Sequence, residues 1–195
     1  MNKIIFKGKW VKEDDPKLQI SDSTYLKIYH NKTIVFVYLL FILLLTFTKF
    51  YYLNSQENYS LSITIIACVI GFLILIPIFL IHEVLHAICF PKNVVKEIYF
   101  NYNKKDILSV SLMTYCEAPL KKYDFIKMLL FPNLVLSIIP MILWLVGIFD
   151  FEPIISKVLG LIISISLCGS ISDLTMIISI LFQVTDKKTH IFMTS

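Results

Sequence analysis

The chain has 195 residues and is 57% hydrophobic, whereas an ordinary soluble domain is about 45–50% apolar. Its formal net charge is +4, and it has 18 lysines and no arginine. The hydrophobic residues gather in long blocks between short lysine-bearing segments, a pattern that excludes an ordinary soluble domain and is typical of a polytopic membrane protein.

Four apolar blocks each reach the roughly 20 residues that a helix needs to cross a bilayer. The first begins too late and is too long for a cleavable signal peptide, so we expect it to act as a signal anchor. We predict a mainly α-helical polytopic membrane protein with a tail at 1–32, a four-helix membrane domain at 33–185 and a second tail at 186–195. The predicted transmembrane helices are Ile34–Leu53, Leu61–Phe90, Phe125–Phe149 and Pro153–Val184.

The lysines are distributed unevenly between the segments that flank these helices. All but two of the 18 lie in the tails, in segment 91–124 or in the first turn of the third helix, whereas Lys49 and Lys157 flank the other two connections. Because cytoplasmic loops carry the excess of lysine, we predict a multi-pass protein of the cell membrane with both tails and segment 91–124 in the cytoplasm. No pattern of side chains that could stack on bases accompanies the lysines, so we expect no nucleic-acid partner.

The second predicted helix ends in IHEVLHAICF, where His82, Glu83 and His86 form the motif H-E-x-x-H. Side chains four residues apart lie on one face of a helix, so both imidazoles can reach one metal ion. Imidazole suits Zn²⁺, and the glutamate of this motif is the usual general base for a water nucleophile. The alternative is an interfacial helix end with ordinary polar residues, which the cost of ionisable groups inside a membrane disfavours.

Segment 91–124 carries β-branched and aromatic runs on both sides of NKKD. These runs predict a small β-hairpin at about 95–115, with strands at 95–102 and 107–115. We expect it to lie in the cytoplasm between the second and third helices. Two roles stay open: the hairpin caps the helices, or its edge binds an extended substrate through main-chain hydrogen bonds.

A catalytic zinc site takes three protein ligands, so the motif supplies only two. Besides Glu83, Asp173 is the acidic residue deep within an apolar block, where an unpaired carboxylate would be costly. At 1.5 Å per residue, His82 lies about 12 Å and Asp173 about 16 Å from the cytoplasmic ends of their helices, so the two could share an ion.

A stripe of small residues in the fourth helix ends at Asp173 and would let the second and fourth helices approach closely. Its members follow i, i+3, i+4, i+7 spacing: Ser166, Gly169, Ser170 and Asp173. A packing residue or a lysine partner is the alternative role for Asp173. Glu117 and Asp124 are alternative ligands, although both lie in the lysine-rich segment, where solvated acidic residues are expected.

HEVLHAICF, a strand-like segment, a proline-interrupted third helix and GSISDL in the fourth together resemble the DUF3267 family of membrane zincin peptidases. The resemblance covers about residues 75–185, and the chain is more distantly similar to site-2 proteases. It implies His82 and His86 as zinc ligands, Glu83 as base and Asp173 as third ligand. The chain departs from the site-2 protease pattern N-x-x-P-x-x-x-D-G, because Leu174 follows Asp173.

The predicted function is that of a membrane-embedded zinc metallopeptidase that hydrolyses a membrane-associated protein or peptide near the cytoplasmic interface. The alternative is a non-proteolytic metal-binding membrane protein or a degenerate partner subunit. Glu83 favours hydrolysis, because a site that only holds a metal needs no base. A transporter is disfavoured, since it would need several intramembrane charges along a path.

Overall fold

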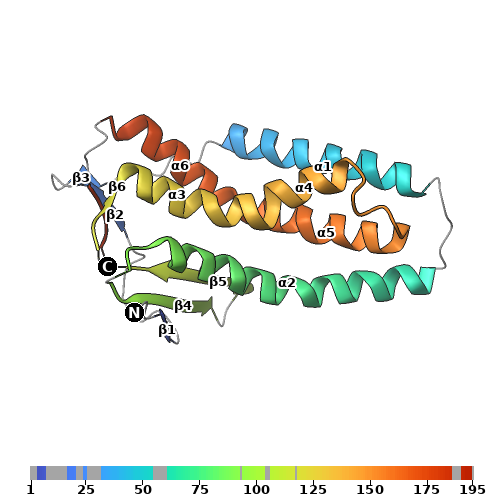
Figure 1. Cartoon of the computed structure of the whole chain (residues 1–195), viewed down its shortest axis with the longest axis horizontal. Helices are drawn as coiled ribbons and strands as arrows, with labels where there is room; N and C mark the ends of the chain where they lie inside the picture. The colour runs from blue at the N-terminus through green and yellow to red at the C-terminus, as the bar shows by residue number, and fades with distance from the viewer. Residues whose placement is uncertain are drawn as a thin grey trace. The chain divides into compact units, whose positions relative to one another are not determined.

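The computed structural model describes residues 4–7, 17–20, 24–25, 32–54, 61–92, 94–103, 106–116, 118–185 and 190–194. The chain is mainly helical and divides into two compact units. The strand-bearing unit comprises Met1–Tyr29, Leu80–Pro132 and Asp173–Ser195. The second unit comprises His30–Phe79 and Asn133–Ser172, and we call it the all-helical unit because its described elements are all helices. Figure 1 labels helices α1–α6 and strands β1–β6.

Within the described residues, four helical segments are long and apolar enough to cross a membrane, as predicted. The first is α1 (Lys32–Asn54), and the second lies in α2 (Leu61–Cys89). The third joins α3 (Lys122–Asn133), the π-helical turn η1 (Leu134–Ile138) and α4 (Ile139–Leu145). The fourth joins α5 (Pro153–Gly169) and α6 (Ile171–Gln183). The side of a membrane on which each end lies remains a prediction.

Two of these segments differ in detail from the predicted helices. The third ends at Leu145 rather than Phe149, because the chain turns at Gly147, whose φ of 88° is readily adopted by glycine. The fourth is interrupted at Ser170, whose hydroxyl donates to the carbonyl oxygen of Leu167 over 2.7 Å. Hydroxyl groups that bond to nearby backbone compete with regular helix. The predicted stripe from Ser166 to Asp173 therefore does not follow one continuous helix.

The all-helical unit packs α1 against α5. Its core gathers apolar side chains from α1, α4 and α5: Ile42, Leu53, Met141, Trp144, Ile163 and Leu167. The indole N–H of Trp144 donates to the carbonyl oxygen and hydroxyl of Ser156, at 2.8 and 2.9 Å. Ser156 in turn donates to Asp150, which forms an ion pair with Lys49. This network supplies hydrogen-bond partners for the buried polar groups of Trp144 and Ser156.

The predicted hairpin is present as β4 (Lys96–Asn103) and β5 (Asp106–Tyr115), which pair antiparallel. Strand β1 (Ile4–Lys7) pairs parallel with β4, so the sheet order is β1-β4-β5. A second sheet has the order β3-β2-β7-β6 and joins residues from both ends of the chain. Its strands are β2 (Lys17–Ile20), β3 (Thr24–Tyr25), β6 (Leu120–Lys121) and β7 (His190–Thr194).

Pairing between the two sequence ends was not predicted. These strands are short, and although β2 pairs with the nearby β3, its other partner, β7, lies at the opposite end of the described chain. The predicted tails at 1–32 and 186–195 therefore contribute strands to the strand-bearing unit, while the predicted domain boundaries stay a prediction.

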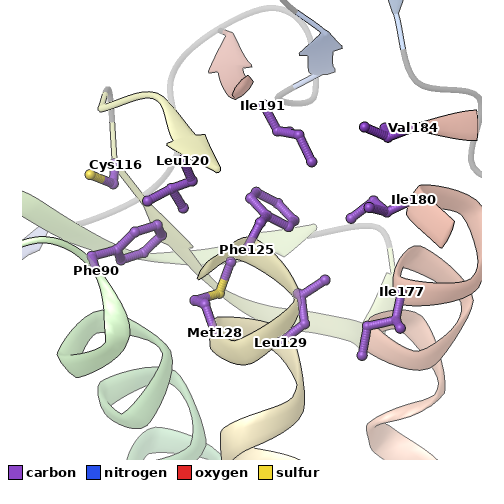
Figure 2. Close-up of a cluster of buried hydrophobic side chains, with 10 residues drawn as sticks. All are labelled: Phe90, Cys116, Leu120, Phe125, Met128, Leu129, Ile177, Ile180, Val184 and Ile191. Carbon is purple, nitrogen blue, oxygen red and sulfur yellow. The ribbon is translucent and has the colours of Figure 1, made fainter. Parts of the chain in front are cut away.

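The core of the strand-bearing unit lies between the end of α2, the start of α3 and α6. Figure 2 shows the fully buried ring of Phe125 among side chains from α3, from α6, from the second sheet and from Phe90, just after α2. The other members are Phe90, Cys116, Leu120, Met128, Leu129, Ile177, Ile180, Val184 and Ile191. The ammonium group of Lys122 donates to the carbonyl oxygen of Val184, just beyond α6. A cation there stabilises the end of the helix, so packing and charge both hold α3 against α6.

Candidate metal centre

The structure brings two neighbouring histidines together with an aspartate that lies far along the sequence. His82 and His86 lie one turn apart near the end of α2, as their spacing predicts. Asp173 lies in the first turn of α6, where the helix dipole favours a carboxylate. All three belong to the strand-bearing unit.

Their metal-binding atoms converge on one point. The His82 Nε2 atom lies 3.1 Å from Asp173 Oδ2 and 3.0 Å from His86 Nε2, and His86 Nε2 lies 3.4 Å from Asp173 Oδ2. The side chains are only 12%, 6% and 13% exposed for His82, His86 and Asp173, in that order. Among the described residues, this is the group of histidine, cysteine and acidic side chains that could hold a metal ion.

A hydrogen bond to the backbone determines which nitrogen of His86 faces this point. The His86 Nδ1 atom lies 2.8 Å from the carbonyl oxygen of Met128. Because a carbonyl oxygen can only accept, Nδ1 carries the proton and donates it. The Nε2 atom of neutral His86 then presents its lone pair to His82 and Asp173, which is the arrangement that a metal-binding histidine needs.

The spacing of these atoms fits a zinc ion. In a tetrahedral site with bonds of about 2.0–2.1 Å, neighbouring ligand atoms lie about 3.3–3.4 Å apart. The three separations, from 3.0 to 3.4 Å, are within a few tenths of an ångström of that value. Without a cation, the lone pair of neutral His86 Nε2 would face the carboxylate oxygen of Asp173, which cannot donate a proton. The donor set, two imidazoles and a carboxylate, is also one that zinc accepts in catalytic sites.

Glu83 lies on α2 between the two histidines, and its carboxylate is held by strand β5. The hydroxyl of Thr114 lies 2.7 Å from Glu83 Oε2 and 3.0 Å from the backbone carbonyl oxygen of Glu83, and it donates to them. Sequence reasoning missed Thr114 and the Met128 carbonyl. Both partners come from elements distant in the sequence, and no local pattern marks either one.

The other acidic candidates do not join this centre. The side chain of Asp124 is 54% exposed, and its carboxylate lies 4.0 Å from the ammonium group of Lys127. Asp124 is therefore a solvated acidic residue at the start of α3. Glu117 lies outside the described residues. Asp173 contacts two histidines, and these contacts do not support the alternative in which Asp173 pairs with a lysine.

Comparison with known proteins supports the same chemistry. No curated protein and no solved structure matches the chain. A family model does match, over residues 74–187, and its family carries the description "Putative zincin peptidase". The match covers more than half of the 195 residues and includes both histidines, Glu83 and Asp173. A match of this extent over the metal-binding residues shows that the chain belongs to the DUF3267 family.

Proposed function

We propose that this protein is a membrane-embedded zinc metallopeptidase. The observation that carries the proposal is the convergence of His82 Nε2, His86 Nε2 and Asp173 Oδ2 within 3.0–3.4 Å of one another, beside the carboxylate-bearing Glu83. These three side chains would hold Zn²⁺ and leave a fourth position for water and substrate, as catalytic zinc sites do.

The ion, when bound, lowers the pKa of a water molecule to about 7 and polarises the peptide carbonyl group. The chain supplies the proton transfers. Glu83 accepts a proton from the attacking water and delivers it to the leaving amine, so that the peptide C–N bond breaks and a C–O bond forms. The Met128 carbonyl keeps the His86 ring in its metal-binding orientation. Low exposure of all three ligands restricts competing water.

Embedding in a membrane is supported by the apolar side chains that the helices present outward. On α1, Phe36, Leu43 and Phe47 are each more than 60% exposed. A soluble protein rarely exposes a continuous apolar surface of this kind, whereas lipid solvates it. The lysine distribution supports cytoplasmic tails. Because His82 and His86 lie in the last turns of α2, just before a lysine-bearing segment, the proposed substrate is a membrane-associated protein or peptide near the cytoplasmic interface.

Metal analysis of the purified protein beside two variants tests this proposal. We expect the wild type to retain about one zinc per chain, His86→Ala to lose it, and Glu83→Gln to retain it. Cleavage of a defined peptide library in detergent micelles, read by mass spectrometry, is expected for the wild type and absent for Glu83→Gln. Zinc content unchanged in His86→Ala would eliminate the site. Zinc binding by a wild type that cleaves nothing would favour the non-proteolytic alternative.

A further inference from the structure

We infer that Thr114 is a positioning residue, whose hydroxyl holds the carboxylate of the proposed base Glu83 in the orientation that proton transfer requires. The inference rests on the proposed function. It adds strand β5 to the proposed catalytic site, whose other residues come from α2 and α6.

The contact is short and partly buried. The Thr114 Oγ1 atom lies 2.7 Å from Glu83 Oε2, and Thr114 is only 9% exposed. The same hydroxyl lies 3.0 Å from the carbonyl oxygen of Glu83. It carries one proton, and a hydrogen bond to an ionised carboxylate is roughly twice as strong as one to a neutral acceptor. The carboxylate is therefore the preferred acceptor, and the carbonyl is a secondary one.

The donor is more rigid than the group that it holds. Threonine is β-branched, so its χ1 angle is restricted. The backbone of Thr114 is also held by pairing with Ile98 in the β4–β5 ladder, and Ile98 is 1% exposed. Glutamate has a longer and freer side chain, whose rotamer freedom is costly to lose. A fixed hydroxyl thus limits the orientations open to Glu83.

The two carboxylate oxygens of Glu83 can take different roles in this geometry. Oε2 accepts the hydrogen bond that the Thr114 hydroxyl donates, which leaves Oε1 to take the proton of the attacking water. Oε2 can keep this hydrogen bond after Oε1 is protonated. Glu83 can therefore receive the proton and pass it to the leaving amine without breaking its contact to β5.

Paired substitutions separate this role from a purely structural one. Thr114→Val keeps the shape and removes the hydroxyl, whereas Thr114→Ser keeps the hydroxyl. We expect Thr114→Val to retain zinc and KM while kcat falls about 10- to 100-fold, the usual effect of removing a partner of an active-site group. Thr114→Ser should recover most of the lost kcat. The matched control is Thr46→Val, because the Thr46 hydroxyl bonds to Ile42 and Ser164 and not to Glu83.

A second measurement does not depend on cleavage. Acetohydroxamate, a zinc-directed ligand, gives up a proton when it binds and so reports on the base. We expect Thr114→Val to weaken its binding about tenfold, the loss expected for one hydrogen bond to a charged group. In a Glu83→Gln background the same substitution should have no further effect, because the two residues act as one unit.

Three outcomes would overturn the inference: unchanged kcat and acetohydroxamate affinity in Thr114→Val, additive effects of Thr114→Val and Glu83→Gln, or no recovery in Thr114→Ser. Should Thr114→Val not fold, Thr114→Ala replaces it, and loss of zinc or of the folded state in both would show that the hydroxyl serves the fold alone. A wild type that binds zinc and acetohydroxamate yet cleaves no peptide refutes the proposed peptidase activity, while the affinities still decide the role of Thr114.

Discussion

The ring of His86 donates from Nδ1 to the backbone carbonyl oxygen of Met128, over 2.8 Å. This carbonyl is available because of the sequence of α3. In a regular helix it would accept the N–H of the residue four positions later, which here is Pro132. Proline has no N–H. A proline inside α3 thus frees an acceptor for a histidine on α2 and links the third helix to the metal centre.

The first prediction follows from this link. Pro132→Ala supplies an N–H that competes with His86 for the Met128 carbonyl, so we expect zinc affinity to fall by up to about tenfold. Folding stability should be unchanged or higher, because proline inside a helix is destabilising. Competition with a chromogenic zinc chelator measures the affinity. Pro140→Ala, in α4 of the all-helical unit, should leave it unchanged. An equal loss in both variants would contradict the link.

The second prediction concerns the third ligand. Asp173→Asn keeps the size of the side chain and removes its charge. We expect zinc affinity to fall at least about tenfold, because an ionised carboxylate is a much better zinc ligand than a neutral amide. Asp124→Asn is the matched control, since Asp124 is exposed and lies outside the cluster. Zinc titration of both variants measures the difference. Equal affinity in Asp173→Asn and wild type would remove Asp173 from the site.

Much of this centre could be predicted from the sequence. The i, i+4 spacing of His82 and His86 needs only a helix, and Asp173 is conspicuous because a carboxylate in an apolar block is costly. What could not be predicted is the set of groups that orient them. The Met128 carbonyl belongs to the backbone, which every residue has, and Thr114 is one hydroxyl in a strand. Their importance arises from tertiary contacts alone.

In the fold, too, local features could be predicted from the sequence and long-range contacts could not. Apolar blocks long enough to cross a bilayer as helices predicted the four long helical segments, because length and hydropathy are local properties of the sequence. The break at Ser170 and the pairing of β2 with β7 depend on side-chain hydrogen bonds and on partners far along the chain. Neither leaves a periodic signal in the sequence.

The third prediction links metal to stability. Because α2 and α6 each supply ligands, bound zinc should hold the two helices together. Zinc at 100 times its dissociation constant would stabilise the folded state by about 2.7 kcal/mol. Removal of the metal with a chelator should therefore lower the thermal midpoint in micelles, and added zinc should restore it. His86→Ala should show no response to either treatment. A zinc-dependent shift that persists in His86→Ala would locate the stabilising metal elsewhere.

The fourth prediction tests the packing of the all-helical unit. Gly160 lies on α5 against the buried ring of Trp144, and an ideal Cβ there would lie 2.2 Å from Trp144 Cζ2. The ring is fully buried and is held by its hydrogen bonds to Ser156, so it cannot move away cheaply. We expect Gly160→Ala to lower the free energy of unfolding by about 1–3 kcal/mol, the usual cost of overpacking a core.

The control for that substitution is Gly71→Ala in α2. An ideal Cβ at Gly71 would lie 3.3 Å from Val158 Cγ1, a side-chain atom that a small adjustment can accommodate. Its effect should stay within about 1 kcal/mol, because alanine also favours the helix more than glycine does. Titration with a denaturing detergent, followed by circular dichroism, compares the two variants. Equal stability of both variants would show that the Trp144 ring has room to move, and it would contradict the tight packing of α4 against α5.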